Sequence, residues 1–315
     1  MQKTPVSQTP RTRFKGIAML LLTAFIWGSA FIAQSVGMET IDAFTFNGMR
    51  SVFAVCALLP VIVIRDLWTG RSRKHDAQKA AGSGEDLHTK KRRLLRHGLL
   101  LGLVFFCATN LQQFAFYDST AGKIAFLTSL YLFFVPLFGL PFGKRISGKM
   151  WLFIGIGFIS LYFLCIRPGE NFSVNRGDLL AFLCAMAFAV QILLIERFSR
   201  EDDGLKLAWF QLFVSGFLSL VMMFLLEAPS LSAIVTAGVP LLYAGVLSSA
   251  AAYSLQIAGQ KYTEATLASL LMCMESVFAL VTAWFVLGER MTPRELTGCA
   301  LLLFAVVAAT LSNKS

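Results

Sequence analysis

Ten apolar runs divide this chain, and each is about as long as a helix that crosses the hydrocarbon core of a bilayer. Only 15% of the residues are charged and 56% are hydrophobic, whereas soluble domains carry about 25% charged residues. The sequence therefore predicts an all-α integral membrane protein with ten transmembrane helices. The runs lie at about 16–36, 43–64, 98–117, 122–142, 150–166, 178–196, 206–226, 238–258, 265–287 and 294–312.

An internal repeat relates the first half of the chain to the second. Residues Thr263–Ala265 resemble Ser119–Ala121, and Gly288–Arg290 resembles Gly143–Arg145, with a slip of one residue between the two pairs. The matching segments lie about 145 residues apart in a chain of 315 residues, which indicates two related halves of five helices each. The expected tail, first repeat and second repeat are residues 1–15, 16–168 and 178–312.

The Lys and Arg residues predict how the runs cross the membrane. If the N-terminus is cytoplasmic, the cytoplasmic segments hold 22 of the 28 Lys and Arg residues, and the opposite loops hold four. Because cytoplasmic loops carry the excess of basic residues, we expect both termini in the cytoplasm of a multi-pass protein of the cell membrane. The net charge of +10 then needs no nucleic-acid partner. The cytoplasmic segments are 1–15, the long basic linker 65–97, 143–149, 197–206, 259–264 and 313–315.

The repeat and the orientation together predict inverted halves. Five runs, an odd number, separate the loop at Gly143–Arg145 from its counterpart at Gly288–Arg290, so the two halves should cross the bilayer in opposite directions. Inverted repeats place a solute site near the middle of the membrane, where the halves meet, and support alternating access to its two sides.

Patterns that would indicate an enzyme, a metal or a cofactor are missing from the sequence. The three histidines, His75, His88 and His97, lie in the linker without metal-ligand spacing, and the six cysteines fall inside apolar runs. There is no Gly-rich loop of the kind that holds the phosphates of ATP. We therefore expect no catalysis, no cofactor and no metal. The expected partners are a small-molecule solute and the lipid bilayer, and a homodimer is left open.

Four stretches carry sequence patterns of a known family. They are Phe25–Phe31, Phe44–Arg50, Phe126–Tyr131 with Val135-Pro136, and Glu275–Ala279 with Leu287–Arg290. Through them the chain resembles the drug/metabolite transporter superfamily, in its ten-helix EamA type, over roughly residues 16–312. The resemblance implies a solute carrier with two EamA-like repeats. Members typically move amino acids, other small metabolites, nucleotide sugars or drugs, so the resemblance does not name the solute.

Two positions depart from the pattern of the family. Many relatives have proline after the acid of the ninth helix, where this chain has Ser276, and many have an acid at the end of the fourth helix, where this chain has Lys144. The first departure removes an expected helix kink. The second weakens the idea that both halves use an acid at the end of this helix.

Two charged residues inside the apolar runs are the first candidates for solute binding. Arg50 lies about a third of the way into the second run, and Glu275 lies near the middle of the ninth. An intramembrane charge costs at least about 2.5 kcal/mol on insertion scales. Arg50 could clamp a carboxylate or phosphate, or it could tie two helices together. Glu275 could carry a coupling proton or bind a solute amine, or it could hold helices together as a neutral or Arg-paired acid.

Uncharged polar side chains inside the runs complete the candidate site. Such side chains usually face the interior of a helical bundle, where many only join helix to helix by hydrogen bonds. As a group they predict a polar, aromatic central cavity. The candidates for solute contact are Trp27, Asn47, Asn110, Gln113, Tyr131, Gln191, Tyr253 and Gln256, and Tyr117 and Gln211 also lie in or beside the runs.

The sequence is best explained by a secondary transporter of a small metabolite that works by alternating access. An exporter of amino acids or related metabolites is the first hypothesis, and sugars, nucleotide-type metabolites and cationic drugs are alternative solutes. A membrane enzyme that acts on lipid or lipid-linked sugar is a second hypothesis, but its acid and base groups should cluster at one interface. A scaffold that transports nothing is a third, although it has no need of inverted halves.

Overall fold

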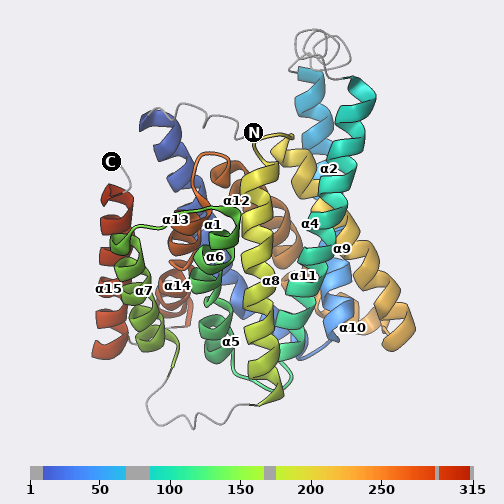
Figure 1. Cartoon of the computed structure of the whole chain (residues 1–315). Helices are drawn as coiled ribbons and strands as arrows, with labels where there is room; N and C mark the ends of the chain where they lie inside the picture. The colour runs from blue at the N-terminus through green and yellow to red at the C-terminus, as the bar shows by residue number, and fades with distance from the viewer. Residues whose placement is uncertain (1–9, 69–85, 167–174, 288–290, 313–315) are drawn as a thin grey trace.

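The computed structural model describes residues 10–68, 86–166, 175–287 and 291–312, and Figure 1 shows them as a bundle of helices without a strand in the described ranges. Ten helical stretches are long and apolar enough to cross a membrane, which confirms the predicted fold class. The spans are formed by α1 (Pro10–Met38), α2 (Ala43–Trp68), α4 (Leu87–Ala115), α5 (Ala121–Thr128) with α6 (Tyr131–Gly139) and η1 (Leu140–Phe142), α7 (Gly148–Cys165), α8 (Arg176–Phe198), α9 (Gly204–Leu226), α11 (Gly238–Leu242) with η2 (Tyr243–Ala252) and α12 (Tyr253–Gln260), α13 (Ala265–Met272) with α14 (Glu275–Leu287), and α15 (Pro293–Ser312). The short helix α10 (Leu231–Thr236) joins α9 to α11.

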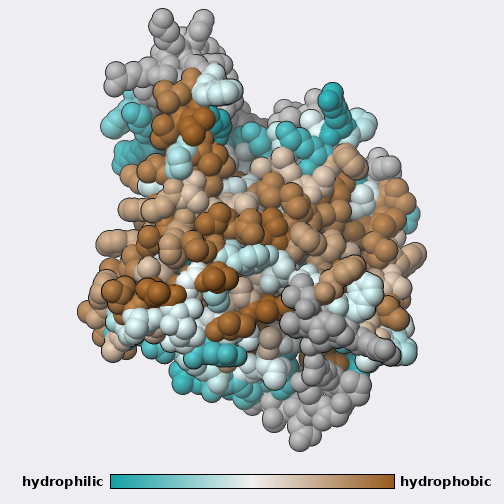
Figure 2. Space-filling model, turned by 180° about the vertical axis from the view of Figure 1, so that it is seen from behind, coloured by the Kyte–Doolittle hydropathy of each residue, from teal (hydrophilic) through white to brown (hydrophobic). Residues whose placement is uncertain are grey.

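Large apolar side chains cover the outside of the bundle. In Figure 2 they form a band across the middle of the molecule, and hydrophilic residues lie above and below the band. Exposed aromatic and branched side chains of this kind include Phe217, Phe224, Phe285 and Phe304. A soluble protein would bury such a surface, whereas lipid tails can cover it. The chain is a multi-pass membrane protein.

The basic linker is shorter than the sequence suggested. The prediction that residues 65–97 form a loop is wrong at both ends, because α2 continues to Trp68 and α4 begins at Leu87. Both helices project beyond the rest of the bundle at the top of Figure 1. Lys, Arg and Leu, which dominate residues 90–96, are strong helix formers, so a high density of charge does not end a helix. Residues 69–85, like residues 1–9 and the motif at 288–290, lie outside the described part of the chain.

Two of the spans are kinked at matching positions. Between α5 and α6, Leu130 N–H donates to the Leu127 carbonyl (3.1 Å), three residues back, and between α13 and α14 Met274 N–H donates in the same way to Leu271 (3.2 Å). A bond to the third residue back tightens the helix locally and changes its direction. The expectation that Ser276 removes a kink is therefore wrong, because the ninth span bends two residues earlier and without proline.

The helices pack across the boundary between the two expected repeats. The closest pairs are α2 with α9, α4 with α8 and α9, α7 with α15, and α1 with η2, α12 and α14. The pairing of α4 with α8 corresponds to that of α12 with α1 when the second five spans are aligned with the first. The correspondence of these pairs, like that of the kinks, is consistent with inverted repeats.

Ionic contacts join the helices at the end of the bundle where α1 begins and α15 ends, which we call the terminal end. Arg65 at the end of α2 pairs with Asp203 at the start of α9 (2.9 Å), and Lys206 pairs with Asp66 (2.8 Å). Nearby on α4, His97 Nδ1 lies 2.6 Å from a carboxylate oxygen of Asp202. These contacts hold α2 and α4 of the first half against the α8–α9 connection of the second.

At the other end of the bundle, which we call the opposite end, one carboxylate joins α9 to α2. Glu227 follows α9, and its oxygens accept hydrogen bonds from the backbone N–H groups of Phe44 (2.8 Å) and Thr45 (2.7 Å) and from the Thr45 hydroxyl (2.7 Å). The first N–H groups of a helix have no partner within the helix, and a negative charge is favourable beside them. Polar contacts therefore fasten the α2–α9 pair at both of its ends.

Candidate functional site

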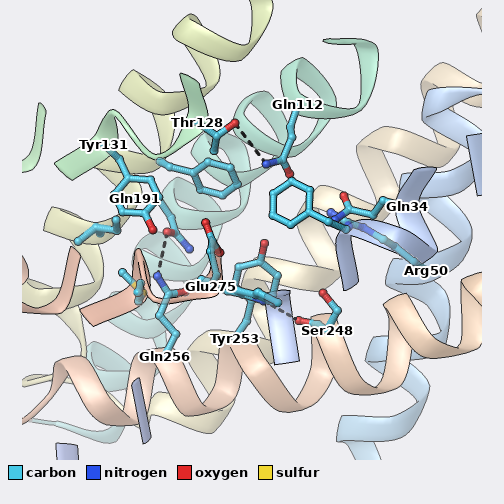
Figure 3. Close-up of a pocket in the computed structure, with 15 residues that line it drawn as sticks. Gln34, Arg50, Gln112, Thr128, Tyr131, Gln191, Ser248, Tyr253, Gln256 and Glu275 are labelled. Carbon is cyan, nitrogen blue, oxygen red and sulfur yellow. Dashed lines mark hydrogen bonds between the residues drawn. The ribbon is translucent and has the colours of Figure 1, made fainter. Parts of the chain in front are cut away.

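A cavity lies inside the bundle, and its walls come from most of the spans. It encloses about 40 Å³, which is room for about three water molecules. A solute as large as an amino acid has to widen it. Figure 3 shows polar side chains from several helices pointing into the same space. The lining is Trp27, Phe31 and Gln34 of α1, Arg50 of α2, Gln112 of α4, Thr128, Tyr131, Phe188, Gln191 and Ile192 of α5, α6 and α8, Ser248, Tyr253 and Gln256 of η2 and α12, and Met272 and Glu275 of α13 and α14.

Arg50 brings a buried cation to this cavity. Its side chain belongs to the second turn of α2 and is 3% exposed. Within the described residues it has no hydrogen bond and no ion pair, and its guanidinium carbon lies 5.9 Å from the ring centre of Phe46. The side-chain oxygen of Gln34, in the same lining, also has no partner there. A guanidinium with free donors in a site of low dielectric is suited to a carboxylate or phosphate.

Glu275 brings an acidic side chain to the same cavity. It is the first residue of α14, directly after the kink, and is 5% exposed. The described residues offer its carboxyl group no hydrogen bond and no ion pair. A carboxyl group in such surroundings is much easier to bury neutral than charged.

A glycine on α1 allows the kinked span to lie close behind the cavity. A Cβ atom on Gly28 would lie 2.5 Å from the carbonyl oxygen of Glu275 and 2.8 Å from the backbone nitrogen of Ala279. Any larger residue would push α14 away from α1. The stretch Phe25–Phe31 therefore positions Glu275 through its glycine as well as supplying Trp27 and Phe31 to the lining.

A chain of amide side chains forms one wall of the cavity. Gln256 Nε2 donates to Gln191 Oε1 (3.4 Å), and Gln191 Nε2 donates to Gln211 Oε1 (3.1 Å), as Figure 3 shows for the first pair. The outer oxygen of Gln256 and nitrogen of Gln211 lack partners among the described residues. Amides that have both a donor and an acceptor to offer can bind polar groups of either kind.

The aromatic wall of the cavity rests on an irregular helix. Trp27 Nε1 donates to the Ser248 carbonyl (3.1 Å), and the Trp27 ring packs against Tyr253 with ring centres 4.9 Å apart. Ser248 belongs to η2, a π-helical segment of ten residues. Wide helical turns of this kind are uncommon and are often found at functional sites.

The structure brings most of the predicted candidates together. Trp27, Arg50, Tyr131, Gln191, Tyr253, Gln256 and Glu275 all line the cavity. Asn47, Asn110 and Gln113 do not: Asn47 Nδ2 donates to Asn110 Oδ1 (2.9 Å), and Asn110 Nδ2 donates to Ser219 (3.1 Å), between α2, α4 and α9. Gln113 is fully buried, and neither of its side-chain polar atoms has a partner in the described ranges.

Several lining residues did not stand out in the sequence. Gln34, Gln112, Thr128 and Ser248 face the cavity, and none was a candidate. A signal existed for Gln34, because it follows Trp27 and Phe31 by seven and three positions and so lies on the same helical face. No comparable signal separates Gln112 from its neighbour Gln113, which the helical rotation turns to a different face.

Comparison with known proteins identifies the family. The profile of the EamA-like transporter family matches residues 14–166 and again residues 175–311. The chain belongs to the EamA-like transporter family. Ten-helix EamA proteins are part of the superfamily that the four sequence stretches resembled, so this prediction is confirmed.

Named relatives of this EamA protein are transporters whose solutes are not stated. One from Archaeoglobus fulgidus is called an uncharacterized transporter and is 27% identical over 93% of this chain and 84% of its own length. The uncharacterized transporter YoaV of Bacillus subtilis is 24% identical over 92% of this chain and 95% of its own length. A solved crystal structure covers 94% of the chain at a TM-score of 0.72 and 16% identity, which supports the fold alone.

Proposed function

We propose that this EamA protein is a secondary transporter that carries a small metabolite through the central cavity by alternating access. The observation that carries the proposal is that one cavity is lined by a cation, Arg50, and an acid, Glu275, each without a partner among the described residues. Buried charges without partners are costly, and a protein retains them where a ligand completes them.

The first class of solute to consider is an amino acid or a related metabolite. The guanidinium of Arg50 can hold a carboxylate with two parallel hydrogen bonds, and the rings of Trp27, Phe31 and Tyr253 can pack against an apolar side chain. An α-amino group would bind near the amides of Gln191 and Gln256. Sugars, nucleotide-type metabolites and cationic drugs are the alternative solutes, and of these a sugar or a cationic drug would bring Arg50 no anionic group.

Glu275 is the proposed coupling residue. A proton on its carboxyl group removes the charge, so a change in access that depends on this proton would link solute movement to a pH gradient. The two matches to the family profile, over 14–166 and 175–311, and the matching kinks favour two related halves that rearrange around the cavity. We propose export from the cell as the direction.

A ligand-stabilisation screen tests the proposal. Purified protein is melted in the presence of amino acids, nucleotide precursors, sugars and amines, and each ligand that raises the melting temperature is tested for counterflow in proteoliposomes. We expect a carboxylate-containing solute to stabilise the protein and to exchange across the membrane. Conversion of a stabilising ligand into a product without counterflow would favour the membrane enzyme instead.

A further inference from the structure

The two kinks described above are alike residue by residue. Ser129 N–H donates to Ala125 as Cys273 N–H does to Ser269, and Phe134 N–H donates to Leu130 as Phe278 N–H does to Met274. The kinks therefore fix a correspondence between the fourth and ninth spans. In this correspondence Tyr131, the first residue of α6, occupies the place of Glu275, the first residue of α14.

Both residues of this matched pair reach the cavity as buried groups without partners. Tyr131 is 4% exposed and Glu275 is 5% exposed, and α6 packs against α13, which directly precedes α14. The Tyr131 hydroxyl makes no well-formed hydrogen bond to a described residue, although the thiol of Cys273, a weak acceptor, is close enough to interact with it. A buried hydroxyl without a partner is unfavourable, so a second arrangement that supplies one is to be expected.

Most other hydrogen-bond donors of the lining are already in use. The indole N–H of Trp27 and the side-chain amides of Gln112, Gln191 and Gln256 each donate to protein oxygen atoms. The phenol of Tyr253 and the amide nitrogen of Gln34 also have no acceptor among the described residues, but of these free donors it is Tyr131 that stands at the position matched to Glu275 by the kinks. Its phenol O–H can give a short, strong bond to a carboxylate without bringing a charge of its own.

We propose that Tyr131 and Glu275 together form one proton-binding site, in which the Tyr131 hydroxyl donates a hydrogen bond to the Glu275 carboxylate after its proton has left. The proton passes from the carboxyl group to water on the open side of the membrane, and Tyr131 keeps its own proton. The inference rests on the proposed coupling role of Glu275. In this site the second half of the chain supplies the acid, and the first half supplies the hydrogen-bond donor at the matching position.

Most of the other titratable groups around Glu275 are uncharged. Tyr253 of α12, Cys184 of α8, Cys165 of α7 and Cys273 of the kink interact with it electrostatically and are neutral groups in an apolar interior. Arg50 is the charged group that shares the lining, and it forms no ion pair with Glu275. Repulsive charges therefore do not surround Glu275, and a neutral donor is what its ionised form lacks.

An infrared pH titration of the purified protein tests this site without requiring the solute. The signal is the band of a protonated carboxyl group that is lost in Glu275→Gln. In Tyr131→Phe, which removes a single oxygen atom, we expect the band to persist to a pH higher by about one unit or more, because a hydrogen bond to a charged group is lost. The control Tyr162→Phe changes a tyrosine of α7 that is 39% exposed and outside the lining, and should not shift the band.

The outcomes separate this inference from the proposed function. If Tyr131→Phe leaves the titration of the band unchanged while Glu275→Gln abolishes pH-driven transport, the coupling role stands and the shared site is wrong. If Glu275→Gln retains pH-driven transport, the coupling role itself is wrong, whatever Tyr131 does. If Tyr131→Phe lowers expression, the same titration is carried out on Tyr131→Trp, whose indole N–H does not occupy the place of the phenol O–H. We expect its carboxyl band to persist to a higher pH than in wild type. A band that titrates as in wild type and in Tyr162→Phe would overturn the shared site.

Discussion

Arg50 and Glu275 line the same cavity, yet no hydrogen bond or ion pair joins them. A static ion pair between the two would have explained both residues as helix ties and kept the acid ionised. Because each remains without a partner in the described part of the chain, both groups are available to a ligand or a proton. The predictions for these two residues follow from the absence of a bond between their side chains.

Replacement of Arg50 by lysine keeps the charge and removes the planar fork. If Arg50 clamps a carboxylate, Arg50→Lys should lower counterflow about tenfold or more, because one of two parallel charged hydrogen bonds is lost. Expression and melting temperature should stay near those of wild type. A matched loss of folding and transport would instead make Arg50 a tie between helices.

Replacement of Glu275 by glutamine imitates the protonated acid at nearly constant shape. Glu275→Gln should retain counterflow of the solute in proteoliposomes and lose accumulation driven by a pH gradient. Persistence of pH-driven accumulation would show that the coupling proton binds elsewhere. Loss of solute binding as well would indicate that Glu275 contacts a cationic group of the solute.

The sequence was sufficient for the spans because lipid imposes a simple rule. Every span must satisfy its own backbone hydrogen bonds and present about 20 apolar residues, so hydropathy reveals the helices. It was not sufficient for residues 87–97, where the polar composition resembled a loop although the residues favour helix and Arg93 and His97 find acidic partners on the α8–α9 connection. Those partners are more than a hundred residues away, and periodicity does not detect them.

The sequence predicted the charged residues of the candidate site. It was less successful with uncharged polar residues, because their role depends on the direction in which each side chain points. Arg50 and Glu275 stand out because a charge inside a span needs a reason. Asn47 and Gln191 look equivalent in sequence, yet the first joins α2 to α4 and the second faces the cavity. The direction of the side chain depends on how the helices are rotated against their neighbours, and that is a property of the packing.

The orientation of the chain leads to a prediction about its C-terminus. Because 22 of the 28 Lys and Arg residues lie in the segments that share a side with both termini, a reporter fused after Ser315 should behave as a cytoplasmic protein. A reporter that is active only outside the cytoplasm should give no signal, and a fusion between α7 and α8 should give a strong one. The reverse pattern would overturn the orientation and, with it, the argument for inverted halves.

The contact of Glu227 with the start of α2 should stabilise the fold. Glu227→Gln removes the charge and one of the two acceptor oxygens, so the free energy of unfolding should fall by roughly 1–3 kcal/mol. The measurement is the melting temperature in detergent. Glu264→Gln is the control, because Glu264 is also at a helix end but is exposed and accepts no capping bond. Equal melting temperatures for both variants would mean that the α2–α9 pair does not depend on this carboxylate.

The ionic contact at the terminal end leads to a prediction of pH dependence. Burial alone would raise the pKa of the Asp203 carboxyl, but the hydrogen bond and charge of Arg65, with smaller contributions from Lys206, outweigh it and lower that pKa below the ordinary value of 3.8. An acid with a lowered pKa in the folded state adds stability that is fully present above the pKa of the unfolded chain and is lost as the pH falls through the folded value. Asp203→Asn should therefore melt below wild type at pH 7, and the difference should shrink as the pH falls below 3.8.

Asp86→Asn is the control, since Asp86 also precedes a helix, α4, but is exposed and makes no side-chain capping bond. A difference between Asp203→Asn and wild type that stays constant down to the lowest pH at which both remain folded would assign the effect to the shape of the side chain and not to its charge.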